Sequence, residues 1–378
     1  MTNTEHLDTK SSRGIRRLRD PRPLWPPQPL IDLAAGRDPE HFELTEDLLA
    51  IAADHRMTGL LWSWARTNAP DTELKSQLAV RDLQTQAHLL RVWTLLESTV
   101  LRLRAADIDV ASIKGPITES RWFERAGERP CSDVDLWLSP YQLDRAGDAL
   151  RLLQPDHPWC QFFGELALAG EVQTVTLKVD GIEIDLHLDL LKTGLPMLHS
   201  KEVWDSTQRF ELPGGTEVRV LDPASALFHL LVHLNKDRFQ RLLGYADIAR
   251  IADQEVDWSR LGQLAKIEGL QVSVALSLET VDADLMRPQN AEATRTSGIR
   301  ASMWRTIWRR NIRLLGSAGR TRLRHRQLWI ALMARRPLGD RAKALNCELF
   351  PPRAVLDAAT EHHRPTGPQW IRRILRRN

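Results

Sequence analysis

The sequence predicts an α+β fold in which a small mixed β-sheet is flanked by N-terminal and C-terminal helical regions. Segments that alternate polar and apolar residues, as half-buried strands do, gather between residues 107 and 192. On both sides of this range, apolar residues recur at three- and four-residue intervals, which is typical of amphipathic helices. The pair Asp180-Gly181 separates two alternating runs and predicts the turn of a β-hairpin.

Composition is that of an ordinary globular protein. The chain has 378 residues, of which 42% are hydrophobic and 27% charged, enough for two or three domains. No apolar run approaches about eighteen residues and the N-terminus lacks an apolar signal core, so we expect a cytoplasmic protein without a transmembrane segment. Cys131, Cys160 and Cys347 have neither zinc-site nor disulfide spacing.

Changes in pattern divide the chain into five regions. These are a flexible, basic, Pro-rich arm (1–30), an N-terminal helical region (31–106), an α/β unit (107–192), a second helical region (193–290) and an Arg-rich helical region (291–378). In the first helical region, the segment 72–106 carries an apolar stripe that includes Leu89, Val92 and Leu96. We expect this stripe to pack against the sheet.

The most informative segment is residues 114–138, which contains Asp133 and Asp135 within Ser-Asp-Val-Asp-Leu-Trp-Leu. Side chains on a strand repeat every second residue, so both carboxylates lie on one face. Adjacent carboxylates repel, which raises one pKa unless a cation lies between them. Alone, such a pair more often marks a solvated edge strand.

A second acidic strand follows the Asp180-Gly181 turn and places Glu183, Asp185 and His187 on one face. If this hairpin pairs beside the strand of Asp133, Asp185 becomes a third carboxylate. Three carboxylates on adjacent strands form a site for one or two hard divalent cations such as Mg²⁺. The interpretation fails if Asp185 is turned away from Asp133 and Asp135, or if a lysine already fills the space between the three acids.

Upstream, a short strand at 107–113 runs into Lys114-Gly115-Pro116 and a helical pattern. A glycine turn at a helix N-terminus presents N–H groups that suit phosphate, and Lys114 adds a positive charge. Because Pro116 has no N–H, we expect Lys114 and Arg129 to supply the missing contact. Farther on, His229 and His233 lie four apart on a helix, but no third ligand completes a zinc motif.

In combination these features resemble the uncharacterised nucleotidyltransferase family of the DNA polymerase β-like nucleotidyltransferase superfamily. The matching elements span roughly residues 45–275 and are Ile113-Lys114-Gly115, Arg129, Ser132-Asp133-Val134-Asp135-Leu136, Asp185-Leu186-His187, Leu230-Leu231-Val232-His233 and Asp247. The wider superfamily has Gly-Ser or Gly-Gly about ten residues before the first acid, whereas here Gly115 precedes Pro116 and lies eighteen residues before Asp133.

The resemblance implies a metal-dependent nucleotidyltransferase that transfers a nucleoside monophosphate, AMP from ATP in the favoured case. The acceptor is a hydroxyl of a protein, peptide, small molecule or RNA. Asp133, Asp135 and Asp185 would hold two Mg²⁺ ions and carry catalysis. Residues 107–192 would be the catalytic core and 193–290 the nucleotide- and substrate-binding region.

The resemblance also suggests supporting roles. The nucleotide contacts would come from Lys114, Gly115, Arg129, Ser132 and Lys236. His187 either orients Asp185 or is a histidine at the core edge. Asp247 matches an acid of the family for which the resemblance supplies no role, and an ion pair with Lys236 or Arg238 is one interpretation.

Two other functions remain open. The chain could be a nucleotide-binding or regulatory module without turnover, which Pro116 favours. It could also bind RNA or an acidic partner through residues 295–378, where nineteen Arg and one Lys outnumber two Asp and two Glu, a balance of +16. The remainder of the chain carries −13, so the Arg-rich helices could equally pack on the acidic part of the same molecule.

Overall fold

The computed structural model describes residues 26–40, 42–170, 172–191, 193, 195–236, 239, 241–285, 302–303, 306, 330 and 333–342. Nearly all of the expected N-terminal arm, most of the Arg-rich region and Cys347 lie outside the described residues. Within these ranges, twelve α-helices and one short 3₁₀ helix surround a six-stranded mixed sheet. The predicted α+β fold is confirmed.

The sheet has the strand order β3-β4-β2-β1-β6-β5. Its strands are β1 (Val110–Ser112), β2 (Asp133–Leu138), β3 (Thr174–Val179), β4 (Ile182–His187), β5 (Gln208–Glu211) and β6 (Glu217–Val220). β2 is parallel to β4, β1 is parallel to β6, and the other pairs are antiparallel. The predicted hairpin joins β3 to β4, and its turn residues Asp180 and Gly181 both have positive φ, as a type I′ turn requires. The edge hairpin β5–β6 adds strands from beyond the expected 107–192 unit.

The N-terminal helices are α1 (Gln28–Ala34), α2 (Glu46–Asp54), α3 (Thr58–Asn68) and α4 (Glu73–Arg104). Thr72 caps α4 by accepting a hydrogen bond from the Lys75 backbone N–H. The stripe predicted on this helix is buried in one cluster with the apolar residues of β2 and β4. Packing of the 72–106 helix against the sheet is therefore confirmed.

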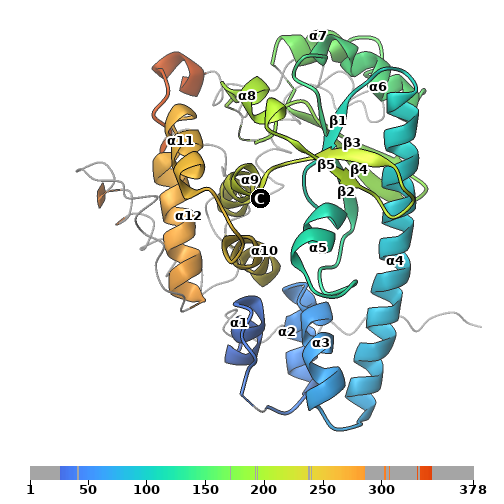
Figure 1. Ribbon diagram of the computed structural model, residues 1–378, viewed down its shortest axis with the longest axis vertical. Coiled ribbons are helices and arrows are strands. Elements are labelled where there is room, and N and C mark those ends of the chain that lie inside the picture. Colours follow the sequence, from blue (N-terminus) through green and yellow to red (C-terminus); the bar gives the residue numbers. More distant parts are fainter. Residues whose placement is uncertain are drawn as a thin grey trace, which may run out of the picture.

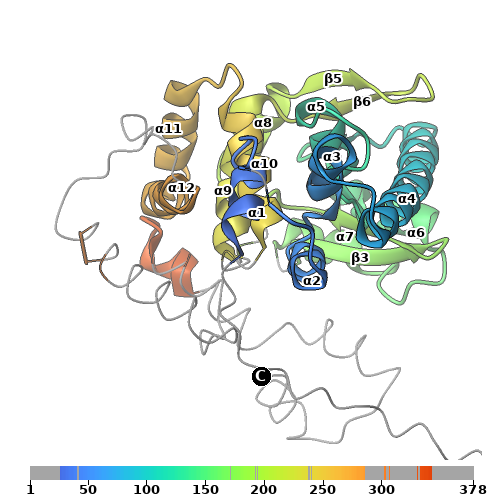
Figure 2. The same ribbon diagram turned by 90° about the horizontal axis from the view of Figure 1, so that it is seen from below.

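The remaining helices cover both faces of the sheet. They are α5 (Pro116–Trp122), α6 (Ala146–Leu153), α7 (Phe163–Leu168), α8 (Ser200–Asp205), α9 (Pro223–Lys236), α10 (Leu242–Ala252), α11 (Trp258–Ile267) and α12 (Gln271–Asp284), with a 3₁₀ helix at Leu143–Arg145. One apolar cluster joins α4, α6 and α7 to one face of the sheet, and the other joins its opposite face to α9 and α10 (Figure 1). Figure 2 shows α4 and α9 on opposite sides of the strands.

Strand alternation decides which side chains meet each helical layer. On β2, Val134 and Leu136 pack in the cluster of α4. Asp133, Asp135 and Trp137 point the other way, and Trp137 belongs to the cluster that contains α9 and α10. The acidic side chains therefore face α9 and α10.

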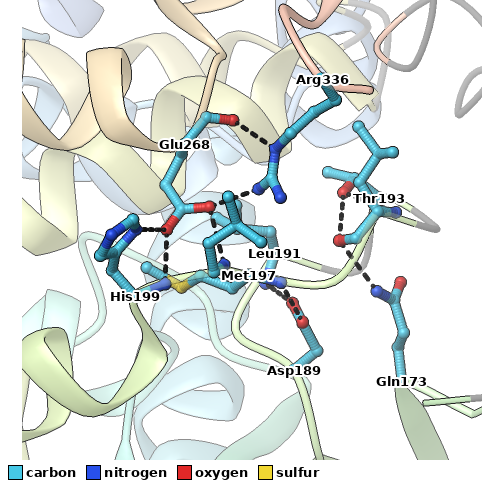
Figure 3. A network of polar contacts seen from close by, with 10 residues as sticks. Gln173, Asp189, Leu191, Thr193, Met197, His199, Glu268 and Arg336 are labelled. Carbon is cyan, nitrogen blue, oxygen red and sulfur yellow. Dashed lines mark hydrogen bonds and ion pairs between the residues drawn. The ribbon is translucent and has the colours of Figure 1, made fainter. Parts of the chain in front are cut away.

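The loop that leaves β4 is held by a buried polar network (Figure 3). Asp189 accepts hydrogen bonds from two backbone N–H groups of this loop. Glu268, fully buried at the end of α11, accepts from the backbone N–H groups of Leu198 and His199 and forms an ion pair with Arg336. At this point an arginine from the basic C-terminal region packs onto the acidic part of the molecule.

Among the described residues, the structure contains no helix with both the length and the apolar character needed to cross a membrane.

Truncating the buried stripe of α4 tests its contribution. Leu96 is 0% exposed, so Leu96→Ala is expected to lower the free energy of unfolding by about 2–5 kcal/mol through lost burial and a residual cavity. Leu90 on the same helix is 68% exposed, and Leu90→Ala should stay within about 0.5 kcal/mol of wild type. Urea unfolding followed by circular dichroism measures both. Equal effects of the two substitutions would contradict the assigned packing.

Candidate metal and nucleotide site

The acidic side chains meet because β2 and β4 are parallel and in register. Asp135 lies directly opposite Asp185, and Trp137 lies opposite His187. One ligand atom from each of Asp135, Asp185 and His187 lies within 4.8 Å of the other two. Asp133, two residues before Asp135, lies on the same face of β2. The pairing on which the sequence argument depended is present.

Burial makes these carboxylates costly to ionise without a cation. Asp135 is fully buried, whereas Asp133 and Asp185 are partly exposed. The pKa of Asp133 is raised, first by burial and then by the neighbouring Asp135, although Lys114 opposes the shift. The arrangement therefore attracts positive charge.

Lys114 supplies one such charge. Its Nζ lies 3.1 Å from Asp135 Oδ1. Burial alone would lower the pKa of Lys114, but Asp135, Asp133 and Asp185 outweigh it and raise the pKa, so the amino group is protonated. One ammonium offsets one of three carboxylates. When all three are ionised, a net negative charge remains that suits a divalent cation. Lys114 therefore occupies part of the space between the acids but does not neutralise all three of them.

Three histidines, His187, His229 and His233, lie around this ion pair. His187 is fully buried, and its Nε2 lies 2.9 Å from Asp135 Oδ1, on the neighbouring strand. The sequence left two roles open for His187, orienting Asp185 or packing at the core edge; one of its ring nitrogens also lies within 4.8 Å of an Asp185 oxygen. Burial, followed by the charge of Lys114, lowers the pKa of both His229 and His233 well below the usual value. His233 is thus neutral, and its Nε2 accepts from Lys114 Nζ at 3.3 Å.

The glycine turn packs tightly against the first acidic strand. Gly115 has φ +68°, and a Cβ there would lie 3.2 Å from the Asp133 carbonyl oxygen, so this position favours glycine. Pro116 is the first residue of the seven-residue helix α5. The proline removes one N–H from this turn, which leaves phosphate binding to depend more on nearby cations.

Arg129 locks the turn to α10. Its Nε and Nη2 donate to the two carboxylate oxygens of Asp247 at 2.7 and 2.8 Å, and its Nη1 donates to the Gly115 carbonyl oxygen at 3.2 Å. This buried bidentate pair gives Asp247 a structural role. The sequence argument assigned Asp247 to Lys236 or Arg238, and Arg238 lies outside the described residues.

A cavity of ≈ 460 Å³ joins these groups. It is lined by nine of the ten residues to which the sequence assigned a catalytic, nucleotide-binding or supporting role: Lys114, Gly115, Arg129, Ser132, Asp133, Asp135, Asp185, Lys236 and Asp247. His187 lies beneath it, against Asp135. Two charged lining residues were not foreseen, Arg56 and Arg241, because neither belongs to a recognisable motif.

Two hydroxyl groups orient the partly exposed acids. Ser132 Oγ donates to Asp133 Oδ1 at 3.3 Å, and Thr176 Oγ1, from β3, donates to Asp185 Oδ1. Cys131 next to the site is buried, and burial raises the pKa of its thiol to about 12. The thiol is therefore protonated at neutral pH and a poor nucleophile.

A family model described as "uncharacterised nucleotidyltransferase" matches residues 43–283. The chain belongs to this family. The matched range is more than half of the sequence and contains all six strands and every residue that lines the cavity. No curated protein matched the sequence. Family membership places this nucleotidyltransferase among the transferases, and the cluster of Asp135, Asp185 and His187 is a candidate metal site in it.

Removing Asp247 tests the buried brace of this nucleotidyltransferase. Asp247→Ala would leave the Arg129 guanidinium buried without its carboxylate, and we expect the free energy of unfolding to fall by about 3–5 kcal/mol. Denaturant titration measures the loss. The double variant Arg129→Met/Asp247→Ala should recover part of it, because no uncompensated charge remains. A double variant as unstable as the sum of its single variants would contradict the coupling.

Proposed function

We propose that this nucleotidyltransferase moves a nucleoside monophosphate, AMP from ATP in the favoured case, onto a hydroxyl group with the help of divalent metal. The observation that carries the proposal is the parallel register that sets Asp135 beside Asp185, on the strand face that also bears Asp133. These acids share a cavity with Lys114 and Lys236, so one pocket offers both metal ligands and phosphate-binding cations.

The donor set fits a hard divalent cation. Carboxylate oxygens are the ligands that Mg²⁺ and Mn²⁺ prefer, and Mg²⁺ typically combines few carboxylates with substrate phosphates. Asp133, Asp135 and Asp185 would hold the metal, two ions when the nucleotide is bound. The bound metal would neutralise negative charge on the phosphates and on the attacking and leaving oxygens.

The protein's own groups would divide the remaining work. Asp185 is partly exposed and oriented by Thr176, so it is placed to take the proton of the acceptor hydroxyl. Lys114 would exchange its contact with Asp135 for one with phosphate. Lys236 would bind phosphate from the end of α9, and Ser132 would hold Asp133 in position. Arg129 would contribute by fixing the Gly115 turn, to whose carbonyl oxygen it donates.

A nucleotide-binding protein without turnover is the second candidate. The contact of Lys114 with Asp135 and the proline at the first residue of α5 both favour it, because each weakens phosphate or metal binding at the turn. Calorimetry with ATP and Mg²⁺ shows whether the nucleotide binds. Binding of ATP, together with no release of pyrophosphate whichever acceptor is added, would support this candidate.

Labelled ATP, Mg²⁺ and a panel of protein, peptide, small-molecule and RNA acceptors test transfer directly. We expect labelling by the wild-type chain and a loss of about 10²–10⁴-fold in Asp185→Asn, because the substitution removes the base. Asp133→Asn should also abolish most labelling. Glu183→Gln is the matched control, since this exposed acid lies on the same strand but outside the cavity. Labelling that persists in both Asn variants would refute the assignment.

Lys114 competes with metal for Asp135, which predicts an effect on metal affinity without nucleotide. Lys114→Met should bind Mn²⁺ roughly 10-fold more tightly than wild type, a change of about 1.4 kcal/mol, because the internal cation is gone. Electron paramagnetic resonance titration of free Mn²⁺ measures this. Lys178→Met, on the exposed face of β3, removes the same charge and should change the affinity less. Weaker binding by Lys114→Met would contradict the competition.

A further inference from the structure

Arg56 reaches the cavity from the N-terminal helical region. It lies in the turn between α2 and α3 and has φ +58°, a left-handed backbone conformation that few non-glycine residues adopt. The preceding residue, His55, joins this turn to the start of α10: its Nδ1 accepts from the Leu242 N–H at 3.2 Å and its carbonyl oxygen from the Leu243 N–H at 3.3 Å. The turn is thereby fixed next to Arg241, the residue before α10.

The N-terminal region is also fixed to the loop that precedes β2. A Cβ on Gly59 of α3 would lie 1.9 Å from the Gly127 carbonyl oxygen, so the backbones are in close contact. Ser63 Oγ donates to Glu128 Oε1 at 2.6 Å, and Arg125 forms an ion pair with Asp82 of α4. Arg56 is therefore presented to the cavity from a rigid support.

Arg56 has charged neighbours of both signs. Burial lowers its pKa first and the neighbouring Arg241 lowers it further; Asp133 opposes them, and Arg129 has a smaller lowering effect. Arg129 is already neutralised by Asp247. Arg56 Nη1 contacts Ser132 Oγ at 3.3 Å, a neutral group. Two arginines at one rim of a cavity repel each other, and an anion bound between them would relieve that repulsion.

The cavity is thus lined by two groups of opposite charge. The acids Asp133, Asp135 and Asp185 form what we call its floor, and the arginines Arg56 and Arg241 form what we call its rim. A ligand that fits both must bring metal-binding oxygens to the floor and further negative charge to the rim. The guanidinium fork matches phosphate oxygens in a bidentate manner. A nucleoside triphosphate carries this second charge on its β- and γ-phosphates, whereas a nucleoside monophosphate does not.

We propose that Arg56 and Arg241 bind the β- and γ-phosphates of the nucleotide and so select triphosphates over monophosphates. This inference rests on the proposed nucleotidyl transfer and assigns to the N-terminal helical region a residue that determines specificity. The pyrophosphate that departs would remain between the two arginines until release. Arg56 and Arg241 thereby hold the leaving group, while the acids act on the α-phosphate.

Calorimetry of the full chain with inorganic tripolyphosphate and Mg²⁺ tests the site without the nucleoside. Arg56→Met is expected to weaken tripolyphosphate binding by roughly 10- to 100-fold, the effect of losing a charged hydrogen-bonded contact. Arg241→Met should weaken it in the same direction, and Arg56→Lys should restore part of the loss. Arg66→Met, an exposed arginine of α3 outside the cavity, is the control and should stay within about twofold of wild type.

Binding of AMP separates a phosphate site from a general loss of structure. AMP affinity should be unchanged in Arg56→Met, and thermal unfolding confirms that the variant is folded. The inference is overturned if wild type binds no tripolyphosphate, if Arg56→Met binds it as tightly as wild type, or if AMP affinity falls equally. A chain that binds tripolyphosphate through Arg56 yet labels no acceptor would uphold this inference while refuting nucleotidyl transfer.

Discussion

The constraint on which the site depends is the register between β2 and β4. Side chains alternate along a strand, so a slip of one residue would turn Asp185 toward α4 and bring Ile184 or Leu186 beside Asp135. The apolar residues of both strands prevent this, because Ile184 and Leu186 are 0% exposed in the α4 cluster and would lose that burial. The β3–β4 hairpin turn fixes the other end of β4. The same packing that stabilises the sheet therefore brings the acids together.

Keeping three acids on one partly buried face has a cost, and the surrounding groups offset it. An ionised carboxylate without a partner is strongly destabilised in a protein interior. Lys114 forms an ion pair with Asp135, the most buried of the three acids. Asp133 and Asp185 instead accept hydrogen bonds from the neutral hydroxyl groups of Ser132 and Thr176. His233 remains neutral because burial, and then the positive charge of Lys114, lowers its pKa. The site is thus stable as it stands and still retains charge for a further cation.

The sequence predicted correctly those features that depend only on a short stretch of neighbouring residues. The hairpin turn, the shared face of Asp133 and Asp135 and the stripe on α4 each follow from a short periodic segment. Partners that lie far apart in the chain were not predictable in this way: Arg129 and Asp247 are 118 residues apart, and from the sequence alone Lys236 was an equally good cation to pair with Asp247. Likewise, one of the two roles expected for His187 paired it with Asp185 on its own strand, whereas its hydrogen bond to Asp135 crosses to β2. A side chain on a strand is often closer to the neighbouring strand than to its own next residue on that face.

Arg56 illustrates the same limit and also what the family match adds. A single arginine after a histidine in a short turn carries no periodic signal, so only the docking of that turn on α10 shows its position. The matched range nevertheless begins at residue 43, before α2, rather than at the strands that bear the acids. A boundary placed there is expected if α2, α3 and their turn belong to the working unit. The brace between Arg125 and Asp82 and the contact of Ser63 with Glu128 support the same conclusion, since they tie this region to the loop that leads into Asp133.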